Sequence, residues 1–257
     1  MHEVSAKKSL GQHFLADRNI ARKIVESLLP GNYETLVEIG PGTGVLTRHL
    51  LQIQDKAFLA VELDKEAFEF LNRTFTEHAS RFVLADFLKY PLDQLKLPVA
   101  LIGNFPYYIS SQIFFKALEH RDKVTQIVCM IQKEVAERIA EPPGSKKYGI
   151  LSVLLQAYFN IDYLFTVHER CFSPAPKVKS AVIRLVRNDR SEVDCNPDLF
   201  FKVIKASFNQ RRKVIRNSLK SVFDHMPEDS SLLSLRPEQL NIEQFIELTR
   251  QLEALNL

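Results

Sequence analysis

An amide, a proline and aromatic rings follow one another in Asn104-Phe105-Pro106-Tyr107, at the end of the apolar run 99–104. A turn needs only Gly, Asn or Pro, so the rings exceed what a chain reversal requires. The Asn104 side-chain oxygen and the Pro106 carbonyl could hold the hydrogens of an exocyclic amine out of the plane of a base, which would free the nitrogen lone pair to attack an activated carbon. Tyr107 offers a stacking face for that base. A helix entry with core aromatics would explain the rings but not the Asn-Pro pair.

A glycine-rich loop, GPGTG at 40–44, lies between an apolar run at 35–40 and a helical pattern. Glycines there let the backbone approach a ligand closely at the carboxyl edge of a sheet. Glu62 follows about 20 residues later, the separation at which an acid reaches ribose hydroxyls. Asp86, at the end of the next run, could accept a hydrogen bond from a ring or an exocyclic amine. The pattern favours a nucleoside cofactor; a plain tight turn with loop acids is the alternative.

Strand-like apolar runs alternate with helical patterns through the first two thirds of the chain. The runs are apolar almost throughout, which is typical of strands buried on both faces. The short connections predict an α/β fold, a mostly parallel sheet with helices on both faces. We predict strands at 35–40, 57–64, 81–86, 99–104, 124–131, 163–168 and 180–186, and helices at 44–52, 65–75, 110–120, 132–141 and 151–159. Two prolines in CFSPAPK (171–177) predict a segment without regular structure.

The polar segment 188–198 contains almost no apolar residues and is interpreted as a linker. Only helical periodicity follows it, in 199–208, 211–223 and 242–255. The sequence therefore predicts an α/β domain over 1–187, a linker over 188–198 and a small all-α domain over 199–257.

Positive charge is concentrated in residues 201–220, which contain seven Lys and Arg and no Asp or Glu. The whole chain carries +3, so removing those seven leaves −4 for the remainder. Such a basic strip favours a polyanionic partner such as nucleic acid. The alternative, a solvated helix face, would usually include acids for i,i+4 pairing. The seven are Lys202, Lys205, Arg211, Arg212, Lys213, Arg216 and Lys220.

The composition indicates a globular protein, with 46% hydrophobic and 25% charged residues. No apolar run reaches the roughly 18 residues of a membrane helix, and the N-terminus lacks an apolar signal core, so we expect a cytoplasmic protein without membrane contact. Three cysteines without CxxC spacing and seven scattered histidines predict neither a disulfide framework nor a metal site. A monomer is expected, because no exposed apolar helix stands out.

Eight motifs, in order from residue 7 to the end, resemble the KsgA family of rRNA adenine dimethyltransferases. One motif alone would be weak, but eight in register are specific. They are KKSLGQHFL (7–15), VEIGPGTGVLT (37–47), VELD (61–64), NFPYYIS (104–110), QKEVAERI (132–139), YGILSVLLQ (148–156), FSPAPKVKSAVIRL (172–185) and FNQRRKVIRNSL (208–219).

The resemblance implies a Rossmann-like methyltransferase fold with S-adenosylmethionine as methyl donor and no metal. Its implied targets are N6 of two adjacent adenines in the 3′-terminal hairpin of 16S rRNA of the small ribosomal subunit, with a role in subunit biogenesis. The implied donor site consists of His13 and Leu15 closing over the donor, Gly40 and Gly42 beneath it, Glu62 on its ribose, Asp86 on its adenine, and Asn104. The implied target site consists of Asn104, Pro106, Tyr107 and Phe172, with Tyr107 and Phe172 sandwiching the extruded adenine. Phosphates would be held by Arg211, Arg212, Lys213 and Arg216.

Three positions depart from the commonest family pattern: His13 stands where Asn is usual, Phe105 where Leu is usual and Tyr108 where Asn is usual. Two alternative functions stay open. One is a 23S rRNA adenine methyltransferase of the macrolide-resistance type, against which QKEVAERI and GQHFL argue. The other is a non-catalytic RNA-binding assembly factor, which would not need an intact Asn-Pro-Tyr site.

Overall fold

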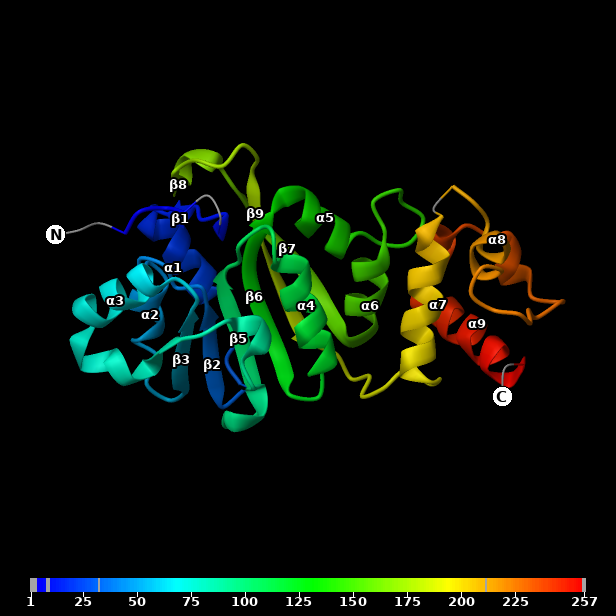
Figure 1. The fold of residues 1–257 in the computed structure, drawn as a ribbon, viewed down its shortest axis with the longest axis horizontal. Coiled ribbons are helices and arrows are strands. Elements are labelled where there is room, and N and C mark those ends of the chain that lie inside the picture. The colour runs from blue at the N-terminus through cyan, green and yellow to red at the C-terminus, as the bar shows by residue number, and fades with distance from the viewer. Residues whose placement is uncertain (1–3, 8–9, 32, 211, 256–257) are drawn as a thin grey trace. The chain divides into compact units, whose positions relative to one another are not determined.

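The computed structural model describes residues 4–7, 10–31, 33–210 and 212–255. The chain divides into two compact units (Figure 1). The first contains residues 1–136 and 161–187, and the second contains residues 137–160 and 188–257. Residues 137–160 therefore group with the C-terminal helices, although they precede the segment 188–198 by almost thirty residues.

A seven-stranded sheet forms the centre of the first unit (Figure 1). Four neighbouring pairs are parallel, and the pair of β6 with β9 is antiparallel. This arrangement confirms the predicted α/β class with a mostly parallel sheet. In spatial order the strands are β4 (Phe82–Leu84), β3 (Ala57–Glu62), β2 (Thr35–Ile39), β5 (Val99–Asn104), β6 (Val124–Gln132), β9 (Ser180–Arg187) and β7 (Phe159–Val167).

The chain order reverses between β2 and β5. From β2 the chain proceeds outward to β3 and β4, and from β5 it proceeds in the opposite direction to β6. Because crossovers between parallel strands are right-handed, the connecting helices of the two halves cover opposite faces of the sheet. Ligands of such sheets bind at the carboxyl ends of the strands, where the order reverses. Ile39 and Asn104 are the last residues of the two strands at that point.

The interior of the sheet explains the unbroken apolar runs. Every residue of β2 is buried, and so is every residue of β5 except Asn104 at its end. The same core extends to the short segments outside the sheet, because it includes Leu15 and Phe172. Burial of a Leu or Phe side chain stabilises a fold by about 1.5–3 kcal/mol. Each buried side chain thus helps to hold the sheet in place, and with it the polar residues at the carboxyl ends of its strands.

Helices α1 (Arg18–Glu26), α2 (Thr47–Leu50), α3 (Lys65–Thr74) and α4 (Ser110–Glu119) belong to the first unit, and α5 (Lys133–Ala140) follows β6. Helix α1 was not among the predicted helices. Its start is fixed by Asp17, whose side chain accepts hydrogen bonds from the N–H groups of Asn19 and Ile20. The predicted helix 44–52 is reduced to α2, because its first residues form the turn after β2.

A two-stranded sheet lies beside the central one and corrects the expectation that 171–177 lacks regular structure. Strand β1 (Phe14–Leu15) pairs antiparallel with β8 (Phe172–Ser173). The prolines exclude a longer strand, but the two residues before Pro174 are free to pair. This pairing places the GQHFL motif beside the FSPAP motif.

In the second unit, the described part of 188–257 contains helices and turns but no strand. Its core is aromatic: the rings of Tyr148 and Phe208 are 6.3 Å apart, and those of Phe208 and Phe245 are 6.0 Å apart. The helices are α6 (Ile150–Tyr158), α7 (Pro197–Asn209), α8 (Ile215–Leu219) and α9 (Ile242–Leu255). The predicted helix 211–223 is reduced to α8, because Val214 is extended. In the described residues, no helix combines the length and the apolar character needed to cross a membrane.

Candidate active site

A cleft opens at the carboxyl edge of the sheet, where the strand order reverses. It contains about 750 Å³ of empty space, including open solvent at its mouth. Its walls come from the N-terminal segment 10–14, the loop after β2, the end of β3, residues 85–87 and residues 104–109. Of the predicted residues, His13, Gly40, Gly42, Glu62, Asp86, Asn104, Pro106 and Tyr107 line this cleft.

The glycine loop reaches the cleft in backbone conformations that other residues rarely adopt. Gly40 and Gly42 have φ values of 64° and 56°. A Cβ added to Gly42 would lie 2.9 Å from the Phe14 ring, so the N-terminal segment packs directly on the loop. The N–H of Gly42 donates a 2.9 Å hydrogen bond to Glu62 Oε2.

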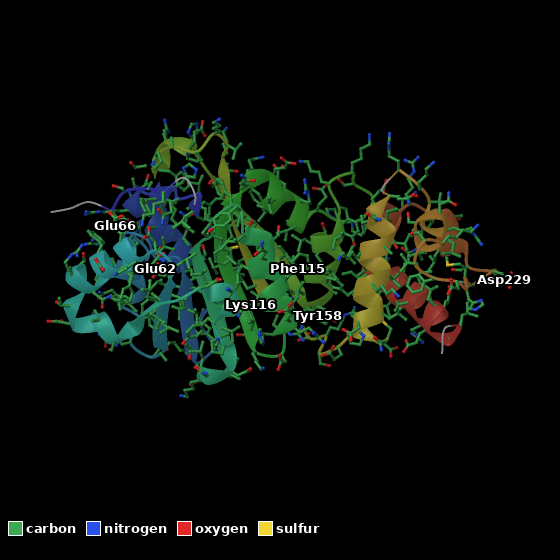
Figure 2. All side chains as sticks on the ribbon, viewed as in Figure 1. Glu62, Glu66, Phe115, Lys116, Tyr158 and Asp229 are labelled. Carbon is green, nitrogen blue, oxygen red and sulfur yellow. The ribbon has the colours of Figure 1, made fainter. Side chains whose placement is uncertain are left out.

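Glu62 is only 5% exposed and is held by backbone donors on both oxygens. Gly42 binds one oxygen, and the N–H of Asp64 donates to the other at 2.8 Å. Burial raises the pKa of Glu62, although these hydrogen bonds oppose the shift. A carboxylate has about four acceptor directions, so the side chain keeps acceptor capacity beyond these backbone donors. Figure 2 labels Glu62 among the side chains of this edge.

A second buried acid, Glu38, was not predicted as a site residue. It is 1% exposed within β2, and Thr47 donates a 2.7 Å hydrogen bond to its Oε2. Burial raises its pKa to about 8; the Thr47 hydrogen bond opposes this, and the nearby Glu62 adds to it. The signal in the sequence was an acid inside an otherwise apolar strand, TLVEI. Its bond to Thr47 joins β2 to the first turn of α2 beneath the glycine loop.

Asp86 begins a short helical turn, Phe87–Lys89, by accepting a 3.0 Å hydrogen bond from the N–H of Leu88. A buried lysine, Lys116 of α4 (labelled in Figure 2), holds the same turn. Its Nζ donates to the carbonyls of Leu88 and Tyr90 at 2.9 and 2.6 Å. Burial lowers the pKa of Lys116, opposed by the charges of Glu119 and Asp86. Lys116 was not predicted as a site residue; its signal in the sequence is a cation among apolar residues in IFFKAL.

The Asn104 amide is fixed by the N-terminal segment. Its Nδ2 donates a 2.8 Å hydrogen bond to the carbonyl of His13, which can only accept. That contact assigns the nitrogen to the His13 side and leaves Oδ1 as an acceptor. The Pro106 carbonyl, two residues on, accepts from the N–H of Ile109 at 3.1 Å and keeps a second lone pair.

Tyr107 is half-buried and anchored through its hydroxyl, which shares a 2.6 Å hydrogen bond with Ser180 Oγ. Burial raises the pKa of Tyr107, opposed by the Ser180 hydrogen bond. The His13 ring lies 5.8 Å from the Tyr107 ring at 31°. His13 Nδ1 donates to the carbonyl of Pro174 at 2.9 Å, so His13 connects Asn104, Tyr107 and the segment after β8.

Two predicted residues do not line the cleft. Leu15 and Phe172 face each other in the β1–β8 pair, and both side chains lie in the hydrophobic core, 4% and 5% exposed. They hold the N-terminal segment against the FSPAP segment. The proposed sandwich of a base between Tyr107 and Phe172 stays a prediction.

Phe105 and Tyr108, the other two departures from the family pattern, differ in burial. Phe105 is buried and packs edge-on against Phe114, with 6.1 Å between ring centroids. Tyr108 is 51% exposed, lines the cleft and lies against Gly11, where an added Cβ would be 3.1 Å from its ring.

The predicted phosphate-binding residues belong to the second unit. Arg212 and Lys213 are exposed in the turn between α7 and α8, and Arg216 donates to the Glu228 carbonyl at 3.4 Å. Arg211 lies outside the described residues. Among the residues that the structure describes, no group of three His, Cys, Asp or Glu side chains could hold a metal ion.

The reversed sheet order, the glycine loop and the acids at the ends of β3 and β4 define a Rossmann-like methyltransferase fold. Two solved structures share it. A dimethyladenosine transferase from Plasmodium falciparum has a TM-score of 0.77 and 24% identity, over 92% of this chain and 96% of that one. The 23S rRNA methyltransferase ErmE has a TM-score of 0.65 and 27% identity, over 93% and 99%.

Sequence comparison defines the family. A family model described as Ribosomal RNA adenine dimethylase matches residues 3–255. The chain is similar to proteins named Ribosomal RNA small subunit methyltransferase A. The one from Parabacteroides distasonis is 51% identical, over 97% of this chain and 94% of the relative, and the one from Cytophaga hutchinsonii is 49% identical, over 98% and 99%. The chain belongs to the ribosomal RNA adenine dimethylase family, which confirms the resemblance and the predicted enzyme class.

Proposed function

We propose that this enzyme uses S-adenosylmethionine to dimethylate N6 of two adjacent adenines in the 3′-terminal hairpin of 16S rRNA. The substrate would be the small ribosomal subunit or its precursor, and the modification would contribute to subunit biogenesis. The observation that carries the proposal is Asn104 at the cleft, with its nitrogen bound to His13 and its oxygen left to accept from a target amine. The names of the relatives at about half identity support the small subunit as substrate.

The residues at the sheet edge fit the proposed methyl donor. Glu62 keeps acceptor directions for ribose hydroxyls, and Asp86 retains an oxygen for the amine of an adenine ring. Gly40 lines the cleft with nothing within 4 Å of an added Cβ, so a ligand can approach its backbone. The donor would supply an electrophilic methyl group on a sulfonium. Residues 10–14 would exclude water from that side of the cleft.

On the target side, the chain would orient the amine. The N6–methyl bond would form as the sulfur–methyl bond breaks, and the proton lost from N6 would pass to water. The Asn104 oxygen and the Pro106 carbonyl would accept the hydrogens of the amine and hold its lone pair toward the methyl group. Orientation of this kind can supply about 7–11 kcal/mol of a barrier. A base in a hairpin must first be extruded, at a few kcal/mol, and stacking on Tyr107 would return about 1–3 kcal/mol. The second stacking face, Phe172, belongs to the proposal and would require its ring to become accessible.

The second unit would grip the RNA. Arg212, Lys213 and Arg216, together with Arg211, would contact phosphates, which position a nucleic acid without reading its sequence. In this proposal residues 1–187 act as the catalytic domain, 188–198 as a linker and 199–257 as the RNA-binding domain. The enzyme would act as a monomer in the cytoplasm, where ribosomal subunits are assembled.

The deciding experiment compares isolated 30S subunits lacking the modification with 23S rRNA transcripts. We expect methyl incorporation into 30S subunits only, with dimethyladenosine located by mass spectrometry. Incorporation into 23S rRNA alone would favour the resistance-type enzyme. That enzyme is the nearest alternative, because this chain shares its fold and 27% identity with the 23S rRNA methyltransferase ErmE. Binding to 30S without any methyl transfer would favour an assembly factor.

A further inference from the structure

Polar contacts to Asp64, which does not line the cleft, attach the N-terminal segment to the edge of the sheet. Asp64, two residues after β3, has a side chain that is only 1% exposed. Lys7 Nζ donates to Asp64 Oδ1, and Gln12 Nε2 donates to Oδ2 at 3.1 Å. The N–H of Glu66 adds a 3.0 Å hydrogen bond to Oδ1. We call Lys7, Gln12 and Asp64 the latch.

The N-terminal segment also makes hydrogen bonds within itself, in addition to those with Asp64. The N–H of Lys7 donates to Gln12 Oε1 at 2.8 Å, and the N–H of Leu10 donates to the Lys7 carbonyl at 3.0 Å. Lys7 Nζ also lies 3.5 Å from Oε2 of Glu66, which Figure 2 labels at the start of α3. These contacts join Lys7 to Gln12 and both residues to Asp64; residues 8 and 9 lie outside the described residues.

The latch adjoins a wall of the cleft, because Gln12 belongs to both. Residues 10–14 line the cleft, whereas Lys7 and Asp64 do not. At its other end the wall is held by the β1–β8 pair and by the bond from Asn104 to His13. Asp64 also donates its N–H to Glu62 Oε1 at 2.8 Å. It therefore connects the wall to the carboxylate proposed to hold the donor ribose.

Lys7 is the counterion on which this arrangement depends. Burial would raise the pKa of Asp64, but hydrogen bonds from Lys7 and Gln12 outweigh it and lower the pKa. Within the described residues, Lys7 is the only cation at ion-pair distance from Asp64. Without it, Asp64, Glu66 and Glu62 would remain as neighbouring acids, and their repulsion would loosen the latch.

We propose that Lys7, acting through Asp64, is a positioning residue for the methyl-donor site. It holds residues 10–14 against the cleft and so prolongs the stay of the donor. The inference rests on the proposed function, because it takes the methyl donor as the ligand of this cleft. Lys7 touches neither donor nor target in this proposal, so its loss affects donor retention rather than the transfer step.

The test variant is Lys7→Met, which keeps the length of the side chain but removes its charge. We expect the dissociation rate and Kd of S-adenosylhomocysteine, and KM for S-adenosylmethionine, to rise about three- to tenfold, the scale of a charge-assisted hydrogen bond at a partly exposed site. kcat at saturating donor should stay within about twofold. The difference from the wild type should shrink as salt rises, because Lys7 is 39% exposed and its ion pair is screened. Lys7→Arg should restore donor retention.

Arg22→Met is the matched control, because it removes an exposed 2.8 Å ion pair with Glu26 on α1, away from the cleft. It should leave donor retention unchanged. An unchanged dissociation rate in folded Lys7→Met, or an equal increase in Arg22→Met, would overturn the inference. If Lys7→Met did not fold, Lys7→Gln would be measured against the same criteria. A wild-type enzyme that did not bind S-adenosylhomocysteine at all would instead contradict the proposed function.

Discussion

The side-chain nitrogen of Asn104 donates a 2.8 Å hydrogen bond to the backbone carbonyl of His13, 91 residues earlier in the chain. A strand end and the N-terminal segment are thus joined at one polar atom. The contact fixes the orientation of the amide, because a carbonyl cannot donate. It also means that the identity of the His13 side chain does not decide this bond, since the backbone makes it. A family pattern with Asn at position 13 and this chain with His can therefore hold Asn104 in the same way.

Asn104→Ala should abolish measurable methyl transfer while weakening donor binding only moderately. The substitution removes the acceptor for the target amine, and loss of one preorganised polar group commonly costs about 10²–10³ in kcat. It also leaves the His13 carbonyl without its donor, which accounts for the moderate effect on the donor. Methyl incorporation into 30S subunits and calorimetric titration with S-adenosylhomocysteine measure the two effects. Full activity in the variant would remove Asn104 from the proposed site.

Glu38 predicts a pH dependence of stability. Its pKa is about 8 in the folded state against an ordinary value of 4.5, so between those values the folded chain holds a proton that the unfolded chain has lost. The free energy of unfolding should therefore fall as pH rises through this window, by up to about 1.4 kcal/mol per pH unit from this group. Glu38→Gln has no such proton, and its stability relative to the wild type should increase from pH 5 to pH 8.

Urea unfolding at several pH values measures this difference. Glu77→Gln is the control, because Glu77 is exposed and should show no trend relative to the wild type. A constant difference between Glu38→Gln and the wild type across the window would show that Glu38 is ionised in the fold.

The elements predicted most accurately from the sequence are strands that are buried on both faces. The run 99–104 is reproduced residue for residue as β5, because a strand covered on both sides must be apolar throughout. Locating these runs also located the polar residues at or near their carboxyl ends. For this reason Glu62, Asp86 and Asn104 were correctly predicted to lie at one edge of the sheet. The pairing of β1 with β8 could not be predicted, because each strand has two residues and they are more than 150 residues apart.

Single buried polar residues were also not predicted as parts of the site. Glu38 and Lys116 each stand alone in an apolar segment, and only tertiary contacts show what they bind. Asp17 gave a usable signal for α1, since Asp directly before a helical pattern is a common N-cap. The contact of Phe172 with the target base, which the family resemblance implies, stays a prediction; the Phe172 ring lies in the core.

Lys116→Met should weaken donor binding without touching the cleft. The change leaves the carbonyls of Leu88 and Tyr90 without their donor, and each buried unsatisfied group costs about 1–3 kcal/mol. The turn that carries Asp86 should loosen, so we expect both a lower Tm and a weaker affinity for S-adenosylhomocysteine. Lys89→Met, an exposed lysine of the same turn, is the control. Wild-type affinity in folded Lys116→Met would show that Asp86 does not depend on this lysine.

Combined substitution of Arg211, Arg212 and Lys213 by Gln should flatten the salt dependence of RNA binding. Each phosphate contact contributes about 0.7–0.9 to the slope of log K against log salt, so the slope should decrease by about 2 to 3. Exposed Arg212 and Lys213 can be changed with little effect on stability. Binding of 30S subunits over a series of salt concentrations measures the slope. The control removes three positive charges, Arg22, Lys23 and Lys65, from the other unit. If both triple variants lowered the slope equally, only the overall charge would matter, and the strip would not be the site that grips the phosphates.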